Sequence, residues 1–123
     1  MRSRSAVRLL VVGLAVVLGC CLMQGCTANA YCNKVQECDN SLSSDDVGVC
    51  IEHYNREINV LRANKEKQCQ AFADATLAFD SCRAQLDCGI FNERDLAGRC
   101  DQEKKTFDQA GDDARGVNCT SLD

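Results

Sequence analysis

Cysteine is the residue type in this sequence best suited to chemistry, and eight of the 11 cysteines follow a repeated spacing. The first four are separated by 6, 12 and 19 residues, and the next four repeat these intervals after a shift of 50 residues. In chain order they are Cys32, Cys38, Cys50, Cys69, Cys82, Cys88, Cys100 and Cys119. Two other residues recur at the same shift, Asp45 as Asp95 and Gly48 as Gly98. The pattern predicts an internal duplication of a C-x5-C-x11-C-x18-C module, with copies at 32–69 and 82–119.

Cysteines at this spacing could form disulfides, hold a metal ion or carry out redox chemistry, and the spacing favours disulfides. Structural zinc sites use close pairs such as C-x2-C, and thioredoxin-like redox sites use the same spacing at the start of a helix. No two cysteines of this chain have that spacing. We therefore predict that all eight framed cysteines form disulfides, with no metal site, no cofactor and no catalytic residue.

Eight cysteines allow 105 pairings, of which helical geometry favours some. We expect Cys38 to end one helix and Cys50 to lie one turn into the next, so that they face each other across an antiparallel hairpin. The same argument pairs Cys88 with Cys100. The other four leave two alternatives open: Cys69–Cys82 with Cys32–Cys119, or Cys32–Cys69 with Cys82–Cys119.

Helices are the elements expected to position these cysteines. From Val47 to Leu86 the apolar residues recur every three or four positions, which is helical periodicity, and no alternating run indicates a strand. The polar stretch 64–70 interrupts the apolar stripe and predicts a break or bend there. The sequence therefore predicts an all-α fold in which each copy is a helix, a turn and a helix.

The expected helix limits follow from capping residues. A short helix is expected at 28–38, and Asp45 or Ser44 is expected to cap the next one. Cys88 and Gly89 are expected to close the long helical stretch, with Gly89 in the left-handed conformation. Asp95 is then expected to cap a last helix that runs to about Gln109 and stops at 111–113.

The N-terminus has the composition of an export signal. Arg2, Arg4 and Arg8 precede an apolar run at 9–22. At about 14 residues, this run is shorter than the ~20 that a helix needs to cross a bilayer core. A cleaved signal peptide is therefore expected rather than a membrane-spanning anchor.

Three places could end the signal. The segment 22–26, Leu-Met-Gln-Gly-Cys, resembles the lipobox of bacterial lipoproteins, which directs a diacylglycerol group to its cysteine, here Cys26. Val17-Leu18-Gly19-Cys20 is a second such segment, which would place the lipid on Cys20. Cleavage after Ala30 is the third, because 28–30 has the A-x-A form. If Cys26 carries the lipid and the signal is removed, the mature chain contains the eight framed cysteines and no further free cysteine.

The expected organisation is a signal at 1–25, with alternative ends at 19 or 30, a tether at 26–31, one domain at 32–119 and a tail at 120–123.

The chain thus resembles the small cysteine-rich lipoproteins of bacteria. The resemblance implies anchoring to an envelope membrane, and Thr27 after the modified cysteine implies sorting to the outer membrane. We expect an exported protein with a structural or protein-binding role, held at the membrane by its N-terminal lipid. The alternative is a soluble secreted effector or inhibitor cleaved after Ala30.

The remaining charged residues do not predict chemistry. The formal net charge of −4 becomes more negative when the signal is removed, so nucleic acid is not an expected partner. The single histidine, His53, is expected to be a solvated helix residue. The pairs Asp45-Asp46 and Asp112-Asp113 lack the spacing of a calcium loop and are expected in caps and turns.

Overall fold

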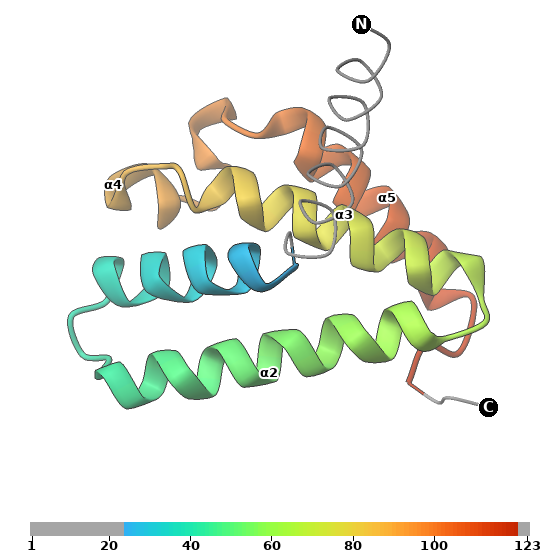
Figure 1. The fold of residues 1–123 in the computed structure, drawn as a ribbon. Coiled ribbons are helices and arrows are strands. Elements are labelled where there is room, and N and C mark those ends of the chain that lie inside the picture. The colour runs from blue at the N-terminus through green and yellow to red at the C-terminus, as the bar shows by residue number, and fades with distance from the viewer. Residues whose placement is uncertain (1–23, 121–123) are drawn as a thin grey trace, which may run out of the picture.

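In the computed structural model, which describes residues 24–120, every regular element is a helix (Figure 1). The all-α prediction is confirmed for this part of the chain. The elements are a first helix at 24–38, α2 (Ser44–Ala63), α3 (Lys67–Arg83), the short α4 (Cys88–Phe91), the 3-10 turn η1 (Leu96–Gly98) and α5 (Asp101–Arg115). No helix of the described residues has both the length and the apolar character needed to span a membrane.

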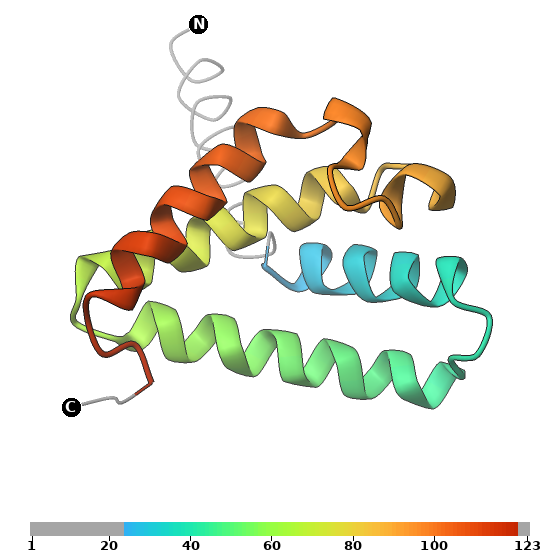
Figure 2. The same cartoon turned by 180° about the vertical axis from the view of Figure 1, so that it is seen from behind.

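The four long helices run in two directions (Figures 1 and 2). The first helix and α3 run one way, and α2 and α5 run the other. Helix α3 packs against both α2 and α5.

Two apolar clusters fill the interior. One contains Phe79, Leu86, Phe91 and Leu96, and the other contains Ile58, Ala73 and Leu77. Both clusters are small, so apolar burial alone gives this fold little stability.

Helix α2 begins where a short polar side chain satisfies its free amides. Ser43 is the N-cap, its hydroxyl accepts from the Asp46 amide, and the Asp46 carboxylate accepts from the Ser43 amide at 2.7 Å. This reciprocal pair is a capping box. The predicted cap, Ser44 or Asp45, is therefore one or two residues too late, since both lie inside the helix.

The predicted break in the long helical stretch is confirmed, because α2 ends at Ala63 and α3 starts at Lys67. Asn64 makes the break stable although it is buried. Its side-chain oxygen accepts from the Glu66 amide at 2.9 Å, and its side-chain nitrogen donates to the Asn118 carbonyl at 3.0 Å. One amide side chain thus fixes the turn and holds the C-terminal segment against it.

The second half of the chain departs from the expected helix limits. Helix α3 stops at Arg83, and Asp87 caps a new short helix by accepting from the Ile90 amide at 3.1 Å. Gly89 lies within α4 and does not close a helix, so that prediction is wrong. Asp95 caps only the 3-10 turn, and α5 starts at Asp101 and continues to Arg115, beyond the expected stop at 111–113.

The late start of α5 has a local cause. The position that corresponds to Ser43 after the shift of 50 residues is Glu93, which cannot form the same capping box. In its place the backbone turns through left-handed conformations at Leu96, Ala97, Gly98 and Cys100. Cys100, with a φ of 58°, is the N-cap of α5.

All eight framed cysteines form disulfides, but the two pairs predicted by the hairpin argument are wrong. Neither Cys38–Cys50 nor Cys88–Cys100 forms. The bonds are Cys32–Cys50, Cys38–Cys88, Cys69–Cys119 and Cys82–Cys100. These pairs also exclude both alternatives for the other four cysteines.

The error lies in the register of the hairpin. The first helix ends at Cys38 and α2 starts at Ser44, so Cys32 and Cys50 each lie six residues from the turn. At 1.5 Å per residue both are about 9 Å from it, and they meet side by side. Cys38 is the last residue of its helix, whereas Cys50 lies six residues into α2, so the predicted pair Cys38–Cys50 is out of register across the turn. In the second half, α3 ends just after Cys82, so Cys82 meets Cys100 at the start of α5.

The observed pairing predicts the number of free thiols in a double cysteine variant. In the double variant Cys38→Ser/Cys88→Ser, both partners of one bond are removed, so the thiol count should not rise above that of the wild type. The free energy of unfolding should fall by about 2–4 kcal/mol. Thiol titration of the denatured, unreduced protein measures the first quantity, and denaturant unfolding measures the second. Two additional thiols would instead indicate bonds from Cys38 to Cys50 and from Cys88 to Cys100.

Candidate functional site

The predicted lipidation residue, Cys26, lies near the start of the first helix. Its side chain is exposed, and within residues 24–120 it is the cysteine that forms no disulfide. Thr27 and Ala28 follow it directly and are buried. The six residues expected as a tether, 26–31, are part of the helix, which packs against the domain through Thr27 and Ala28. The alternative residue Cys20 and the apolar signal segment at 9–22 lie outside the described residues.

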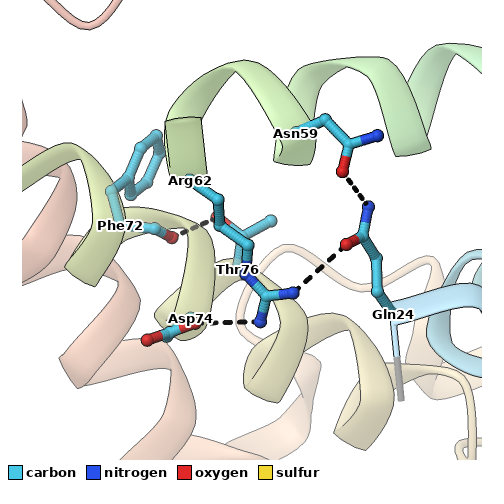
Figure 3. A network of polar contacts seen from close by, with 6 residues as sticks. All are labelled: Gln24, Asn59, Arg62, Phe72, Asp74 and Thr76. Carbon is cyan, nitrogen blue, oxygen red and sulfur yellow. Dashed lines mark hydrogen bonds and ion pairs between the residues drawn. The ribbon is translucent and has the colours of Figure 1, made fainter. Parts of the chain in front are cut away.

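Polar contacts at the start of this helix join three elements (Figure 3). Arg62 of α2 lies between Gln24 and Asp74, donating to the Gln24 side-chain oxygen at 3.1 Å and to the Asp74 carboxylate at 3.0 Å. Gln24 also donates to the Asn59 side chain at 3.1 Å. These groups are exposed, so each contact contributes little to stability.

The other residues considered from the sequence lie at the surface. His53 is 3.1 Å from Glu57, one turn further along α2, and both side chains are 64% exposed. The Ser43 hydroxyl and amide hold the pKa of Asp46 below its ordinary value. Asp112 forms an ion pair with Arg115, and Asp113 accepts from Gln109. In the described part of the chain, no group of three or more His, Cys, Asp or Glu residues could hold a metal ion.

Sequence reasoning missed the most unusual electrostatic feature, a buried polar cluster between the first helix, α2 and α3. Asp80 is only 7% exposed. The Tyr54 hydroxyl donates to one of its carboxylate oxygens at 3.0 Å, and Arg83 approaches the other at 3.4 Å. No motif could have revealed it, because Tyr54 and Asp80 are 26 residues apart and belong to different helices.

Burial shifts the pKa of both acids in this cluster. The loss of hydration raises the pKa of Asp80 above 3.8, against the hydrogen bond from Tyr54 and the charge of Arg83, which lower it. Burial also raises the pKa of Tyr54, and the neighbouring Asp80 carboxylate adds to that rise. Tyr54 is therefore a fixed hydrogen-bond donor at neutral pH rather than an acid.

Three aromatic rings surround the Arg83 guanidinium. Its central carbon lies 4.9 Å from the ring centre of Phe91, 5.3 Å from Phe79 and 5.4 Å from Tyr31. Within the described residues, the buried Arg83 Nε has no hydrogen-bond acceptor. Attraction between a cation and the ring faces contributes about 0.5–2 kcal/mol in such places. The Arg83 cation thus joins the first helix, α3 and α4, and the aromatic rings around it pack as part of the core.

No protein-family model, curated protein or solved structure matches this chain. The geometry of its own residues is therefore the basis for any function assigned to it.

The hydrogen bond from Tyr54 can be tested by removing one oxygen atom. Tyr54→Phe leaves the buried Asp80 carboxylate with one donor fewer, which should lower the free energy of unfolding by about 1–3 kcal/mol. Tyr31→Phe is the matched control, because it keeps the ring against Arg83 and leaves the Asp80 carboxylate untouched. Equal destabilisation of the two variants in denaturant unfolding would contradict the assigned role of Tyr54.

The raised pKa of Asp80 predicts a pH dependence. The folded state binds the Asp80 proton at a higher pH than the unfolded state, where the pKa is near 3.8. The contribution of Asp80 to stability is therefore complete below 3.8 and is lost as the pH rises through the folded pKa. Asp80→Asn removes this dependence, so wild type should gain stability relative to the variant as the pH falls from neutral towards 3.8. Unfolding curves of both proteins at several pH values measure the difference, and a difference that stays constant would contradict the assignment.

Proposed function

We propose that this chain is an exported domain, stapled by disulfides and anchored to an envelope membrane by a lipid on Cys26, with a structural or protein-binding role. The observation that carries the proposal is the state of the cysteines. All eight framed cysteines are paired, and Cys26 remains exposed and unpaired in the described part of the chain. Disulfides of this density persist in oxidising compartments and are rare in the cytosol.

Burial next to Cys26 favours this residue over cleavage after Ala30. A cut before Cys26 removes Gln24, whose contacts are largely exposed, and keeps Thr27 and Ala28. A cut after Ala30 would remove both of these buried residues from the packed helix. With the lipid on Cys26, the helix itself continues from the anchor, so the domain would lie close to the membrane surface.

The disulfide pattern supports the proposed internal duplication. A shift of 50 residues converts the bond Cys32–Cys50 into Cys82–Cys100. The other two bonds, Cys38–Cys88 and Cys69–Cys119, each join residues that are 50 positions apart. Two copies related by a two-fold axis would produce this pattern, because a bond between equivalent residues has to lie across the axis. The first helix with α2 then corresponds to α3 with α5.

A binding or structural role fits the described side chains better than catalysis. Asp80 is buried and Tyr54 is half-buried, and these two groups, which have the clearest environment for altered protonation, are bonded to each other. They hold helices together and present no acid or base to a substrate. Of the surface ion pairs, His53 with Glu57 is a local pair within α2, and Arg62 with Asp74 joins α2 to α3.

Metabolic labelling tests the anchor directly. In a bacterial host that processes lipoproteins, labelled palmitate should be incorporated into the wild type and lost in Cys26→Ser. Cys20→Ser is the matched control and should retain the label. Neither change touches one of the four disulfides, so both variants should keep all eight framed cysteines paired. Label lost only in Cys20→Ser would place the anchor at the alternative residue. An unlabelled protein in the medium that begins at Tyr31 would support the secreted alternative instead.

A further inference from the structure

An open cavity of about 720 Å³ lies between α2, α5 and the segment that follows α5. Its walls are apolar side chains from four parts of the chain: Val60 and Leu61 of α2, Phe72 of α3, Phe107 of α5, and Val117. The bond between Cys69 and Cys119 holds this last segment in place beside the cavity. The part of the wall formed by the segment after α5 is therefore held by a covalent bond, although this segment has no regular secondary structure.

The floor of the cavity depends on close packing between α3 and α5. The Phe72 and Phe107 rings lie 5.4 Å apart, and Phe107 also contacts Phe79 of the core at 5.2 Å. Gly111 lies against Phe72, and a β-carbon at Gly111 would come within 3.3 Å of the ring. The aromatic surface is thus held by the core and does not depend on a ligand to order it.

Charged and polar side chains at the rim have partners on their own helices. The pairs are His53 with Glu57 at 3.1 Å, Arg56 with Glu52 at 2.9 Å, Lys104 with Asp108 at 2.6 Å, and Arg115 with Asp112 at 2.6 Å. A charged ligand would have to compete with these pairs for a counter-ion. An uncharged ligand would lose nothing at the rim and would gain contact with the apolar walls.

A second hollow, of about 770 Å³, occupies the corresponding place in the other half of the chain. It lies between the start of α3 and α5, and five of its lining residues correspond to lining residues of the first cavity after the shift of 50 residues. The pairs are Arg56 with Thr106, Val60 with Ala110, Arg115 with Lys65, Val117 with Lys67, and Asn118 with Gln68. The two hollows share their architecture and differ in chemistry, because lysine occupies the place of Val117.

We propose that the cavity of about 720 Å³ is a binding site for an uncharged, apolar small molecule. Ligand sites in proteins are concave and mostly apolar, with volumes of about 300–1,000 Å³. This cavity has the required size and lining, a covalently held wall, and a rim whose charges already have partners. Because the cavity is open, a polar end of the ligand can remain in water. The other hollow is lined by Lys65, Lys67 and Lys105 and has only two alanines as apolar lining residues, so we expect no binding of such a molecule there.

A pair of fluorescent probes tests both parts of the proposal. N-phenyl-1-naphthylamine is uncharged, and 8-anilinonaphthalene-1-sulfonate has the same ring system with one negative charge. Titrated into the oxidised full chain in its mature form, the uncharged probe should give a saturable increase in fluorescence at one site per molecule. The anionic probe should bind at least about tenfold more weakly, a difference of about 1.4 kcal/mol.

Reciprocal substitutions locate the site. Val117→Lys gives the cavity the residue found in the other hollow and should weaken binding of the uncharged probe about tenfold or more. Lys67→Val and Val49→Lys should leave binding unchanged. Val49→Lys makes the same replacement on α2 at a valine that is 68% exposed and outside the cavity. Val60→Lys is a second change in the cavity wall, and circular dichroism with thiol titration verifies that each variant keeps its helices and disulfides.

Several results would overturn the proposal. They are the absence of saturable binding by the uncharged probe, tighter binding of the anionic probe, and equal affinity in wild type and in both cavity variants. Loss of binding in Lys67→Val would place the site in the other hollow and would also contradict it. None of these results depends on lipidation at Cys26, so they leave the proposed anchor untouched.

Discussion

Covalent crosslinks between helices are the constraint on which the rest of this structure depends. The apolar clusters are too small to hold four helices, and each disulfide joins elements that would otherwise separate: the first helix to α2, its end to α4, α3 to the C-terminal segment, and α3 to the start of α5. Each bond adds about 2–4 kcal/mol, chiefly by restricting the unfolded chain. Four such bonds are comparable with the whole stability of a normal domain, about 5–15 kcal/mol.

A fold held in this way can accept polar groups in its interior. Asp80, Tyr54 and Arg83 occupy positions where apolar side chains would pack, and their mutual contacts offset only part of the cost of burial. The same tolerance allows the segment after α5 to form a cavity wall without regular structure, since Cys119 holds it to α3. The crosslinks therefore stabilise the helices, and they also permit the polar cluster around Asp80 and the irregular segment that lines the cavity.

The sequence predicted what local signals determine. Periodicity and the absence of strand patterns predicted helices, the polar stretch at 64–70 predicted the break at Asn64, and the cysteine frame predicted that eight cysteines pair. The predicted pairing was wrong because it matched Cys38, the last residue of its helix, with Cys50, which lies six residues into α2. Asp87 as a cap, and the meeting of Tyr54 with Asp80, also went unnoticed. Contacts between distant helices depend on packing, which periodicity within one helix does not specify.

The disulfides, and not the apolar core, keep the helices of this protein in place. The most direct measurement is thermal unfolding of the purified mature protein by far-ultraviolet circular dichroism, before and after complete reduction in the same buffer. We expect a cooperative transition for the oxidised protein, and the loss of that transition and of much of the helical signal after reduction. A reduced protein that keeps the helical signal and the same midpoint temperature would contradict it.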